Sequence, residues 1–202
     1  MHNVDVKPPL ILASSSPRRR ELLNQIGVAY QVIVADIDEF IRPGEDAGDY
    51  VRRMAREKAL EVQRRDGVTV AVLGADTAVV VNGRILGKPV DREDAIRMLE
   101  ELSGRTHEVW SAVALVSPGG GRRERLNITR VTFSELERAW IGSYCDSGDP
   151  MDKAGAYGVQ GIAAQKISHM EGSYSGVMGL PLHETAEILQ EAGVLSLASA
   201  AR

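Results

Sequence analysis

Apolar positions along the chain follow two different rhythms, which predict a mixture of strands and helices. Short runs rich in apolar and β-branched residues predict strands at residues 10–13, 31–35, 69–81, 108–116, 126–133 and 166–171. Segments in which apolar residues recur at helical spacing predict helices at about 17–27, 48–65, 91–104, 134–148 and 181–192. Central strands mixed with flanking helices indicate a single α/β or α+β domain over residues 1–202, not separate modules.

Turn and capping residues support several of these boundaries. Ser16 suits an N-cap before Pro17, and Gly27 suits the left-handed position that ends a helix. Asn82 followed by Gly83 is typical of a type I′ hairpin turn.

The second half of the chain carries weaker boundary signals. Ser134 and Glu137 have the spacing of a capping box, which predicts a helix beginning at Ser134. We expect the glycine-rich residues 155–161 to be irregular and the tail after about residue 195 to be frayed.

Composition and charge narrow the class of protein. Of the 202 residues, 44% are hydrophobic and 26% are charged, as in a globular domain with a sizeable core. The formal net charge of −4 argues against a surface built to coat nucleic acid or an anionic membrane. A polyanionic ligand would therefore have to meet a local cluster of basic residues.

Cysteine usage and the start of the chain point to a reducing compartment. Cys145 is the single cysteine, so an internal disulfide and a thiolate metal site are excluded. The first ten residues lack the pattern of a signal peptide, and no apolar run approaches the ~20 residues that span a bilayer. We expect a soluble cytoplasmic protein with neither a membrane nor a nucleic acid as partner.

A strand that leads hydroxyl groups into a helix start predicts an anion site at residues 14–20. The sequence there is Ser-Ser-Ser-Pro-Arg-Arg-Arg, and the free N–H groups of a helix N-terminus favour an anion. Cations in that first turn oppose the helix dipole, a cost that bound phosphate would offset. A capped surface helix with solvated arginines is the alternative.

Lys58 interrupts the apolar face of the second predicted helix. Val51, Met54, Ala55 and Val62 share one stripe, and Lys58 lies in its middle. An inward charge needs an anionic ligand, an acidic neighbour or a wet cleft. A lysine that packs its stem and extends its ammonium into water is the alternative.

Asp76 is the most informative single residue, because it lies inside a long apolar run. A carboxylate in such a place is costly unless it binds a metal, a cation or a positioned water. Mg²⁺ and Mn²⁺ prefer such oxygen ligands, and Glu39 could supply a second carboxylate. An Asp that caps or salt-bridges a strand end, and an acidic loop that is merely solvated, are the alternatives.

Two further segments offer ligand-binding side chains. Lys88, between Gly87 and Pro89, could contact phosphate, and the amide of Gln160 suits the imide edge of a pyrimidine. A plain turn explains the Lys88 segment equally well, and a structural glycine-rich loop is the favoured interpretation of the Gln160 segment. His107 is expected to be structural. Neither a GxxxxGK[ST] loop nor a GxGxxG loop occurs in the chain.

Six motifs follow one another along the chain. They are Leu-Ala-Ser-Ser-Ser-Pro-Arg-Arg (12–19), Gly-Ala-Asp-Thr (74–77), Gly-Lys-Pro (87–89), Ser-Gly-Arg-Thr-His (103–107), Asp-Lys-Ala-Gly-Ala-Tyr (152–157) and Gly-Leu-Pro-Leu (179–182). In this order they resemble the motifs of the Maf family of nucleotide pyrophosphatases, historically called septum formation proteins. The resemblance extends from residue 10 to about residue 189.

The resemblance implies a fold like that of inosine triphosphate pyrophosphatases: a long mixed central sheet with flanking helices, in two lobes around a cleft, often as a homodimer. It implies Asp76 as proton acceptor. Phosphate and metal would be handled by Ser14, Arg18, Arg19, Glu39, Lys58 and Lys88.

Three positions resemble the branch of the family that acts on dTTP and UTP. They are Arg18, Thr77 and Gln160, where the branch acting on 7-methyl-GTP carries Trp, Gln and Glu. Small departures from the family pattern are Arg20, which extends the basic run, and Ser-Gly-Val-Met at residues 175–178.

The resulting hypothesis is a pyrophosphatase that converts a nucleoside triphosphate to the monophosphate. A divalent cation (Mg²⁺, Mn²⁺ or Co²⁺) would bind Glu39 and Asp76, Lys58 and Lys88 would assist catalysis, and Thr77 and Gln160 would read the base. Two alternatives remain open at this point: an enzyme for modified nucleotides, and a nucleotide-sensing regulator of septum formation that needs no turnover.

Overall fold

The computed structural model describes residues 9–195, so the tail expected to fray after residue 195 lies outside the described residues. The α-helices are α1 (Pro17–Gln25), α2 (Ala47–Gln63), α3 (Arg92–Leu102), α4 (Arg138–Asp146), α5 (Tyr174–Met178) and α6 (Leu182–Glu191). Short 3₁₀ helices are η1 (Asp149–Asp152), η2 (Ala154–Ala156) and η3 (Ile162–Lys166). The strands are β1 (Leu10–Leu12), β2 (Gln31–Val32), β3 (Ala71–Val81), β4 (Arg84–Leu86), β5 (Thr106–Val116), β6 (Arg122–Phe133) and β7 (Ile167–Glu171).

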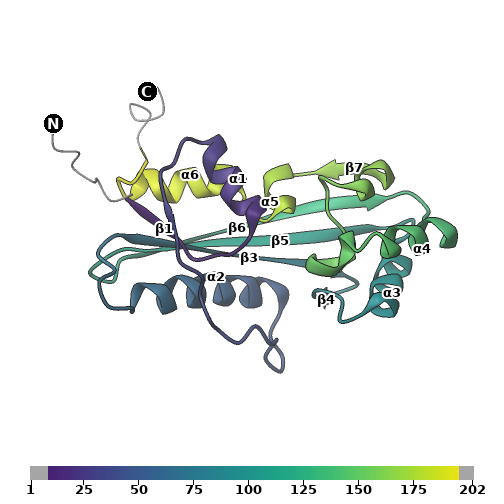
Figure 1. Ribbon diagram of the computed structural model, residues 1–202, viewed down its shortest axis with the longest axis horizontal. Coiled ribbons are helices and arrows are strands. Elements are labelled where there is room, and N and C mark those ends of the chain that lie inside the picture. The colour runs from purple at the N-terminus through teal and green to yellow at the C-terminus, as the bar shows by residue number, and fades with distance from the viewer. Residues whose placement is uncertain (1–8, 196–202) are drawn as a thin grey trace.

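The seven strands form one mixed sheet in the order β2-β1-β3-β5-β6-β7, with β4 also paired to β3. Strand β1 is parallel to β2 and to β3, and the remaining pairs are antiparallel. The long strands β3, β5 and β6 run through the whole molecule (Figure 1). The prediction of a long mixed sheet with flanking helices is confirmed.

Helix α2 covers one face of the sheet, and α1, α5 and α6 cover the opposite face (Figure 1). On the α2 face, Val51 and Ala55 pack against Ala78 and Ala112. Opposite them, one apolar cluster joins α1 and α6 to β3 and β5, and a second joins α3 and α4 to the far ends of the same strands. Two lobes thus share one continuous sheet.

The gap between the lobes arises at one edge of β3. Strand β5 pairs with residues 72–80 of β3, so β1 and β4 must share the other edge. On that edge β1 reaches residue 73 and β4 begins at residue 79. Residues 74–78 therefore have a strand on one side and open space on the other. Because successive side chains of a strand point to opposite faces, Asp76 and Thr77 flank this opening from the two sides of the sheet.

Gly74 lets α2 approach the sheet at this point. A Cβ atom there would lie 2.1 Å from the carbonyl oxygen of Ala55 and 2.9 Å from the amide nitrogen of Ala59. The absence of a side chain at Gly74 therefore fixes how near the middle of α2 comes to β3.

Several predicted turns and caps are confirmed. Gly27 has a φ of 67° after α1, and Ser16 accepts a hydrogen bond from the amide of Arg19 at 3.5 Å. Asn82 and Gly83 have φ values of 50° and 75°, as a type I′ turn requires.

The prediction of a capping box at Ser134 and Glu137 is wrong. Helix α4 begins four residues later than predicted, and Glu137 occupies its N-cap position without a side-chain cap. Ser134 lies just after β6, where its amide and its hydroxyl both donate to the carbonyl of Lys166, at 2.9 and 3.1 Å. That contact ties the end of β6 to the start of β7 instead.

Other parts of the fold also differ from prediction. Strand β2 stops at Val32, because β1 ends at Leu12 and leaves residues 33–35 without a neighbouring strand. Strand β6 begins at Arg122, since register with β5 extends to the hairpin loop. Helix α5 was not predicted: five residues are too few to show helical periodicity.

No helix within residues 9–195 is both long enough and apolar enough to cross a membrane.

Candidate active site

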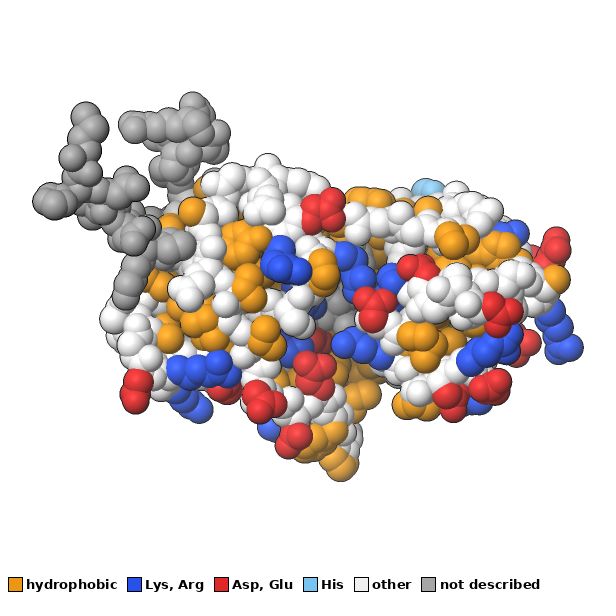
Figure 2. All heavy atoms as spheres, in the orientation of Figure 1, with side chains coloured by type: hydrophobic (Ala, Val, Ile, Leu, Met, Phe, Trp, Pro, Cys, Tyr) orange, Lys and Arg blue, Asp and Glu red, His pale blue; other side chains and the backbone are white. Residues whose placement is uncertain are grey.

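A cavity of about 910 Å³ lies between the lobes, at the open edge of β3. Figure 2 shows lysine and arginine side chains gathered with carboxylates around a hollow in the middle of this face. All nine residues that the sequence singled out line this one cavity: Ser14, Arg18, Arg19, Glu39, Lys58, Asp76, Thr77, Lys88 and Gln160. The structure thus brings together residues from six separate parts of the chain.

The N-terminus of α1 forms one wall. Pro17 begins the helix, and its first turn carries no acidic residue. Arg19 is held in place, since its Nε donates to the carbonyl of Gly179 at 2.8 Å and its Nη1 donates to Ser14 Oγ at 3.2 Å. Burial lowers the pKa of Arg19, whereas the charges of Asp76 and Glu39 act against that shift. Helix N–H groups and a fixed guanidinium there suit an anionic ligand.

Arg18 reaches across the cavity to the other lobe. Its Nη1 lies 3.2 Å from Oδ2 of Asp152, in η1. Lys153 also contacts this carboxylate, at 2.7 Å, and contacts Asp149 at 3.1 Å. Asp152 belongs to a recognised motif, yet nothing in the sequence near Arg18 indicated this pairing, because the two residues are 134 positions apart.

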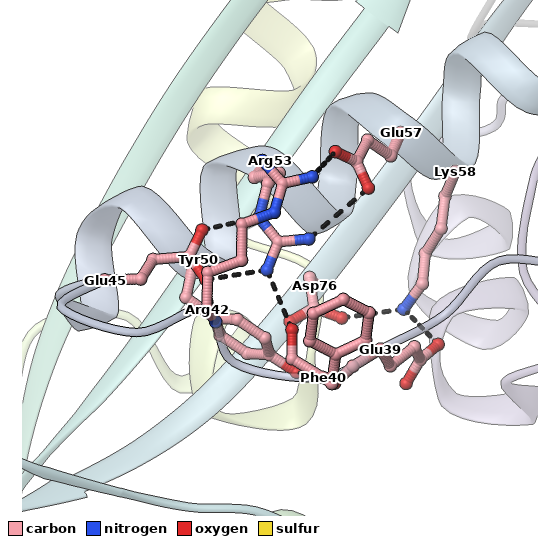
Figure 3. A network of polar contacts seen from close by, with 9 residues as sticks. All are labelled: Glu39, Phe40, Arg42, Glu45, Tyr50, Arg53, Glu57, Lys58 and Asp76. Atoms are coloured by element: carbon pink, nitrogen blue, oxygen red, sulfur yellow. Dashed lines mark hydrogen bonds and ion pairs between the residues drawn. The ribbon is translucent and has the colours of Figure 1, made fainter.

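Lys58 occupies the centre of the site. Its Nζ lies 2.7 Å from Oδ1 of Asp76 and 2.8 Å from Oε1 of Glu39 (Figure 3). Lys58 is 9% exposed and Asp76 is 6% exposed. Lys58 therefore points inward, as expected, and has two acidic neighbours as partners. The alternative, in which its ammonium group extends into water, is wrong.

The pKa values of the two carboxylates that share Lys58 are shifted in opposite directions. Burial raises the pKa of Asp76, although Lys58 and Arg19 act in the opposite direction. Burial alone would also raise the pKa of Glu39, but the hydrogen bond and charge of Lys58 outweigh it and leave that pKa below its usual value. Asp76 is thus the stronger proton acceptor, and Glu39 remains a carboxylate.

Glu39 lies on a loop that α2 holds against the site. Arg53 donates to the carbonyl of Phe40 at 2.9 Å and binds Glu45 through two contacts of 2.5 and 2.6 Å. Tyr50 donates to the carbonyl of Glu39 at 3.1 Å. Figure 3 shows these side chains converging on the loop from α2. Arg53 was not singled out from the sequence, although it lies beside the apolar stripe and has Glu57 one turn later.

Thr77 lies on the opposite face from Asp76. Its Oγ1 is 2.9 Å from Oγ of Ser111, on the neighbouring strand β5. Ser111 in turn donates to the carbonyl of Gly176 at 2.6 Å. Ser111 was not singled out from the sequence, since a serine in a strand carries no distinctive pattern.

Gln160 and Lys88 complete the cavity wall on the side of the lobe that contains α3 and α4. Within residues 9–195 the Gln160 side chain makes no hydrogen bond, so its amide is available to a ligand. Lys88 adds positive charge near Glu39 and contributes to lowering the pKa of that carboxyl.

His107 has the structural role that the sequence indicated. It is buried, its Nε2 lies 2.7 Å from the hydroxyl of Tyr157, and both rings pack against Phe133. Burial lowers the pKa of His107 to about 4 and raises the pKa of Tyr157. This pair anchors the glycine-rich segment that carries Gln160.

The carboxylates of the site fit a divalent cation only in part. Among the described residues there is no group of three or more His, Cys, Asp or Glu side chains arranged to hold a metal ion. Glu39 and Asp76 nevertheless converge, because both contact the same nitrogen atom. Two carboxylates are a usual protein contribution to a Mg²⁺ site when substrate phosphates supply further ligands.

Curated relatives match nearly the whole chain. A dTTP/UTP pyrophosphatase of Bordetella parapertussis is 54% identical over 195 residues, covering 93% of this chain and 94% of the relative. Proteins with the same name from Hahella chejuensis and Colwellia psychrerythraea are 52% and 48% identical, covering 92% and 96% of this chain and 92% of each relative.

Two solved structures overlap the chain more distantly. A nucleoside-triphosphatase / dITP/XTP pyrophosphatase from Mycobacterium abscessus is 17% identical with a TM-score of 0.41, covering 63% of this chain and 75% of that one. The Staphylococcus aureus Ham1 protein is 14% identical with a TM-score of 0.40, covering 78% and 90%.

The family comparison agrees with the resemblance carried by the six motifs. The family described as Maf-like protein matches residues 9–192, which include every residue of the cavity wall. The chain belongs to the Maf family.

Proposed function

We propose that this protein hydrolyses dTTP and UTP to the nucleoside monophosphate and pyrophosphate. The observation that carries the proposal is the single cavity in which the α1 N-terminus, the Lys58–Asp76 pair and the base-reading candidates meet. The proposal is also supported by relatives that are 48–54% identical to this chain and are named dTTP/UTP pyrophosphatase.

The triphosphate binds at the α1 end of the cavity in this proposal. Ser14 and Arg19 are already joined by a hydrogen bond of 3.2 Å, so they present a fixed set of donors beside the N–H groups of the helix. Arg18 and Lys88 add charge from either side of the opening. Such prearranged cations stabilise charge that develops on the leaving pyrophosphate.

Asp76 accepts the proton of the attacking water. A base works best when its pKa approaches the working pH, and burial moves the pKa of Asp76 upward in that direction. Lys58, at 2.7 Å, keeps the carboxylate ionised and orients it. The proton acceptor and its orienting cation thus come from β3 and α2, two rigid elements.

Glu39 and Asp76 are the residues that would hold a divalent cation (Mg²⁺, Mn²⁺ or Co²⁺). When bound, such a cation would act as a Lewis acid on the phosphate chain. The oxygen atoms of both carboxylates point at the same nitrogen of Lys58, so they converge on one place. Glu39 stays ionised at neutral pH because Lys58 holds its pKa low.

Thr77 and Gln160 read the base from opposite lobes. The hydroxyl of Thr77 faces the cavity from β3, and the amide of Gln160 faces it from the glycine-rich segment. Hydroxyl and amide groups suit the alternating donors and acceptors of a pyrimidine imide.

We also propose, on the family resemblance, a homodimer in the cytoplasm. The assembly is tested by light scattering of the purified chain, for which a mass of one subunit at working concentrations contradicts the proposal. Fractionation of cells tests the compartment.

The reaction is tested by pyrophosphate release from a panel of canonical and modified nucleotides, with Mg²⁺, Mn²⁺ or Co²⁺ and after chelation. We expect release from dTTP and UTP by the wild type, loss of release in D76N, and wild-type release in D66N, since Asp66 is exposed and remote. A preference for 7-methyl-GTP would contradict the base assignment. Binding without release from any nucleotide would favour a sensor, and full turnover by D76N would remove Asp76 from catalysis.

A further inference from the structure

Ser111 lies directly opposite Thr77 in the sheet and is fully buried. The two residues are paired in the register of β3 and β5, and their side chains share the face that looks toward α5. Ser111 has 0% exposure, and its hydroxyl makes two polar contacts: 2.9 Å to Thr77 Oγ1 and 2.6 Å to the carbonyl of Gly176.

The direction of these hydrogen bonds is determined by chemistry. A carbonyl oxygen only accepts, so the single proton of Ser111 goes to Gly176. The same carbonyl accepts from the amide of Gly179 at 3.0 Å, which fixes it in the last turn of α5. With its own proton committed, Ser111 can only accept, and the proton of Thr77 must therefore point at Ser111.

Thr77 consequently has no proton left for the cavity. Because Thr77 lines the cavity, its lone pairs are what it can offer a ligand, so Thr77 is an acceptor there and not a donor while Ser111 and Gly176 stay in place. Thymine and uracil carry an N–H on the imide edge, which such an acceptor can bind. Cytosine carries a bare ring nitrogen at the same position, which would set two acceptors against each other.

We propose that Ser111 is a specificity-positioning residue, which fixes Thr77 as a hydrogen-bond acceptor and so selects an imide base over cytosine. This inference rests on the proposed function, in which Thr77 faces the base. It adds to that function a reason for excluding cytidine nucleotides, and it assigns the exclusion to a residue that touches no substrate.

Thr77 could have a competing role, which is to position the guanidinium of Arg19 instead of binding the base. A Cβ atom built on Gly179 would lie 3.5 Å from Arg19 Nε and 3.7 Å from Thr77 Oγ1, so the guanidinium and the hydroxyl are close neighbours. If Thr77 served only to position Arg19, loss of Ser111 would weaken phosphate binding for every nucleotide alike. Selectivity between bases therefore separates the two roles.

The experiment compares kcat/KM for dTTP and dCTP in wild type, S111A, T77V and the double variant. Freed from Ser111, the hydroxyl of Thr77 can turn and donate, so S111A should lower the dTTP-to-dCTP ratio by about tenfold and raise kcat/KM for dCTP itself. T77V, which keeps the shape but loses the acceptor, should also lower the ratio. In the T77V background, S111A should change the ratio no further, because Ser111 acts through Thr77.

Ser143→Ala is the matched control, since Ser143 is exposed and donates only to Ala139 of its own helix. Its ratio should equal that of the wild type. An S111A variant that lowers kcat/KM equally for both nucleotides would overturn the inference while leaving the proposed function intact.

Failure of the proposed function has a different signature. If wild type releases no pyrophosphate from any nucleotide, the same four proteins are compared by calorimetric Kd values for dTTP and dCTP, where an unchanged ratio in S111A would again overturn the inference. Should S111A fail to fold, T77V decides: an unaltered ratio in that variant contradicts the acceptor role.

Discussion

Nζ of Lys58 lies 2.7 Å from Oδ1 of Asp76, so one buried ion pair joins the middle of α2 to the open edge of β3. Both residues interrupt apolar patterns, and each supplies the partner that the other requires. Breaking a buried pair by removing one member leaves an uncompensated charge, which is more costly than never having had the pair.

Replacing Lys58 by methionine tests this pairing. The positive charge of Lys58 lowers the pKa of Asp76, so its loss raises that pKa further and moves the acid limb of the pH–rate profile to higher pH. We expect kcat/KM for dTTP to fall by about 10²-fold at neutral pH, with part of the activity recovered at higher pH. K166M is the control, because Lys166 lies near Trp140 outside the cavity wall. An acid limb unchanged in K58M would contradict the pairing.

Arg53 is expected to hold the loop that carries Glu39. R53M removes the two contacts with Glu45 and the hydrogen bond to the carbonyl of Phe40, and it leaves Glu45 without its cation. Because Arg53 is 5% exposed, we expect a loss of about 3 kcal/mol in the free energy of unfolding, measured in urea. R52M should have little effect, since Arg52 is the exposed neighbour on the same helix.

Activity gives a second readout of the same loop. With the loop released, R53M should need a higher metal concentration for half-maximal activity, because Glu39 is no longer placed beside Asp76. R53K should behave nearly as R53M does, since a lysine cannot bind a carboxylate and a carbonyl with the fork of a guanidinium. An R53M protein with wild-type stability and metal response would show that the loop holds its position without Arg53.

Gly74 is expected to tolerate no side chain. In G74A the new Cβ meets backbone atoms of α2, 2.1 and 2.9 Å away, and backbone cannot turn aside as a flexible side chain can. We expect a loss of about 2 kcal/mol, seen as a fall in Tm of roughly 4–8 °C, together with reduced activity because Lys58 moves with the helix. In G121A the nearest atom is 3.7 Å away, so its Tm should stay at the wild-type value. Equal Tm values for the two variants would contradict this packing.

The site residues were predictable in proportion to how local their signals are. Lys58 and Asp76 stand out because a charge inside an apolar stripe or run must be compensated, whatever the fold. Glu39 and Lys88 lie in loops where charge is ordinary, so their residue types suggested a role but left a plain loop as the alternative until the family resemblance was added. The Thr77–Ser111–Gly176 chain joins residues separated by 34 and 65 positions, so no spacing along the sequence could reveal it.

The fold was likewise predictable where the signals are local and unpredictable where they are not. Strong periodicity located α2, α3 and the long strands to within a few residues, and Gly27, Asn82 and Gly83 marked real left-handed positions. Prediction failed where a tertiary contact replaced a local one. Ser134 caps no helix and instead donates to the carbonyl of Lys166, and β2 is short because the neighbouring strand β1 ends.

His107 is expected to make stability depend on pH in the weakly acidic range. Burial lowers the pKa of His107 to about 4 in the folded protein, against about 6.5 in the unfolded chain, so between these values the unfolded state binds the extra proton. The contribution of the neutral imidazole is therefore complete above pH 6.5 and is lost as the pH falls from 6.5 to 4. It amounts to on the order of 3 kcal/mol across the window.

The double variant H107F/Y157F isolates this effect, because it removes the titrating ring without leaving the hydroxyl of Tyr157 unpaired in the core. Urea unfolding at a series of pH values should give a steeper loss of stability between pH 6.5 and 4 for the wild type than for the double variant. H169F is the control, since His169 is exposed on β7 and lies outside the aromatic cluster. Parallel curves for wild type and H107F/Y157F would mean that His107 becomes protonated without unfolding the aromatic cluster, and that the segment carrying Gln160 is held by packing alone.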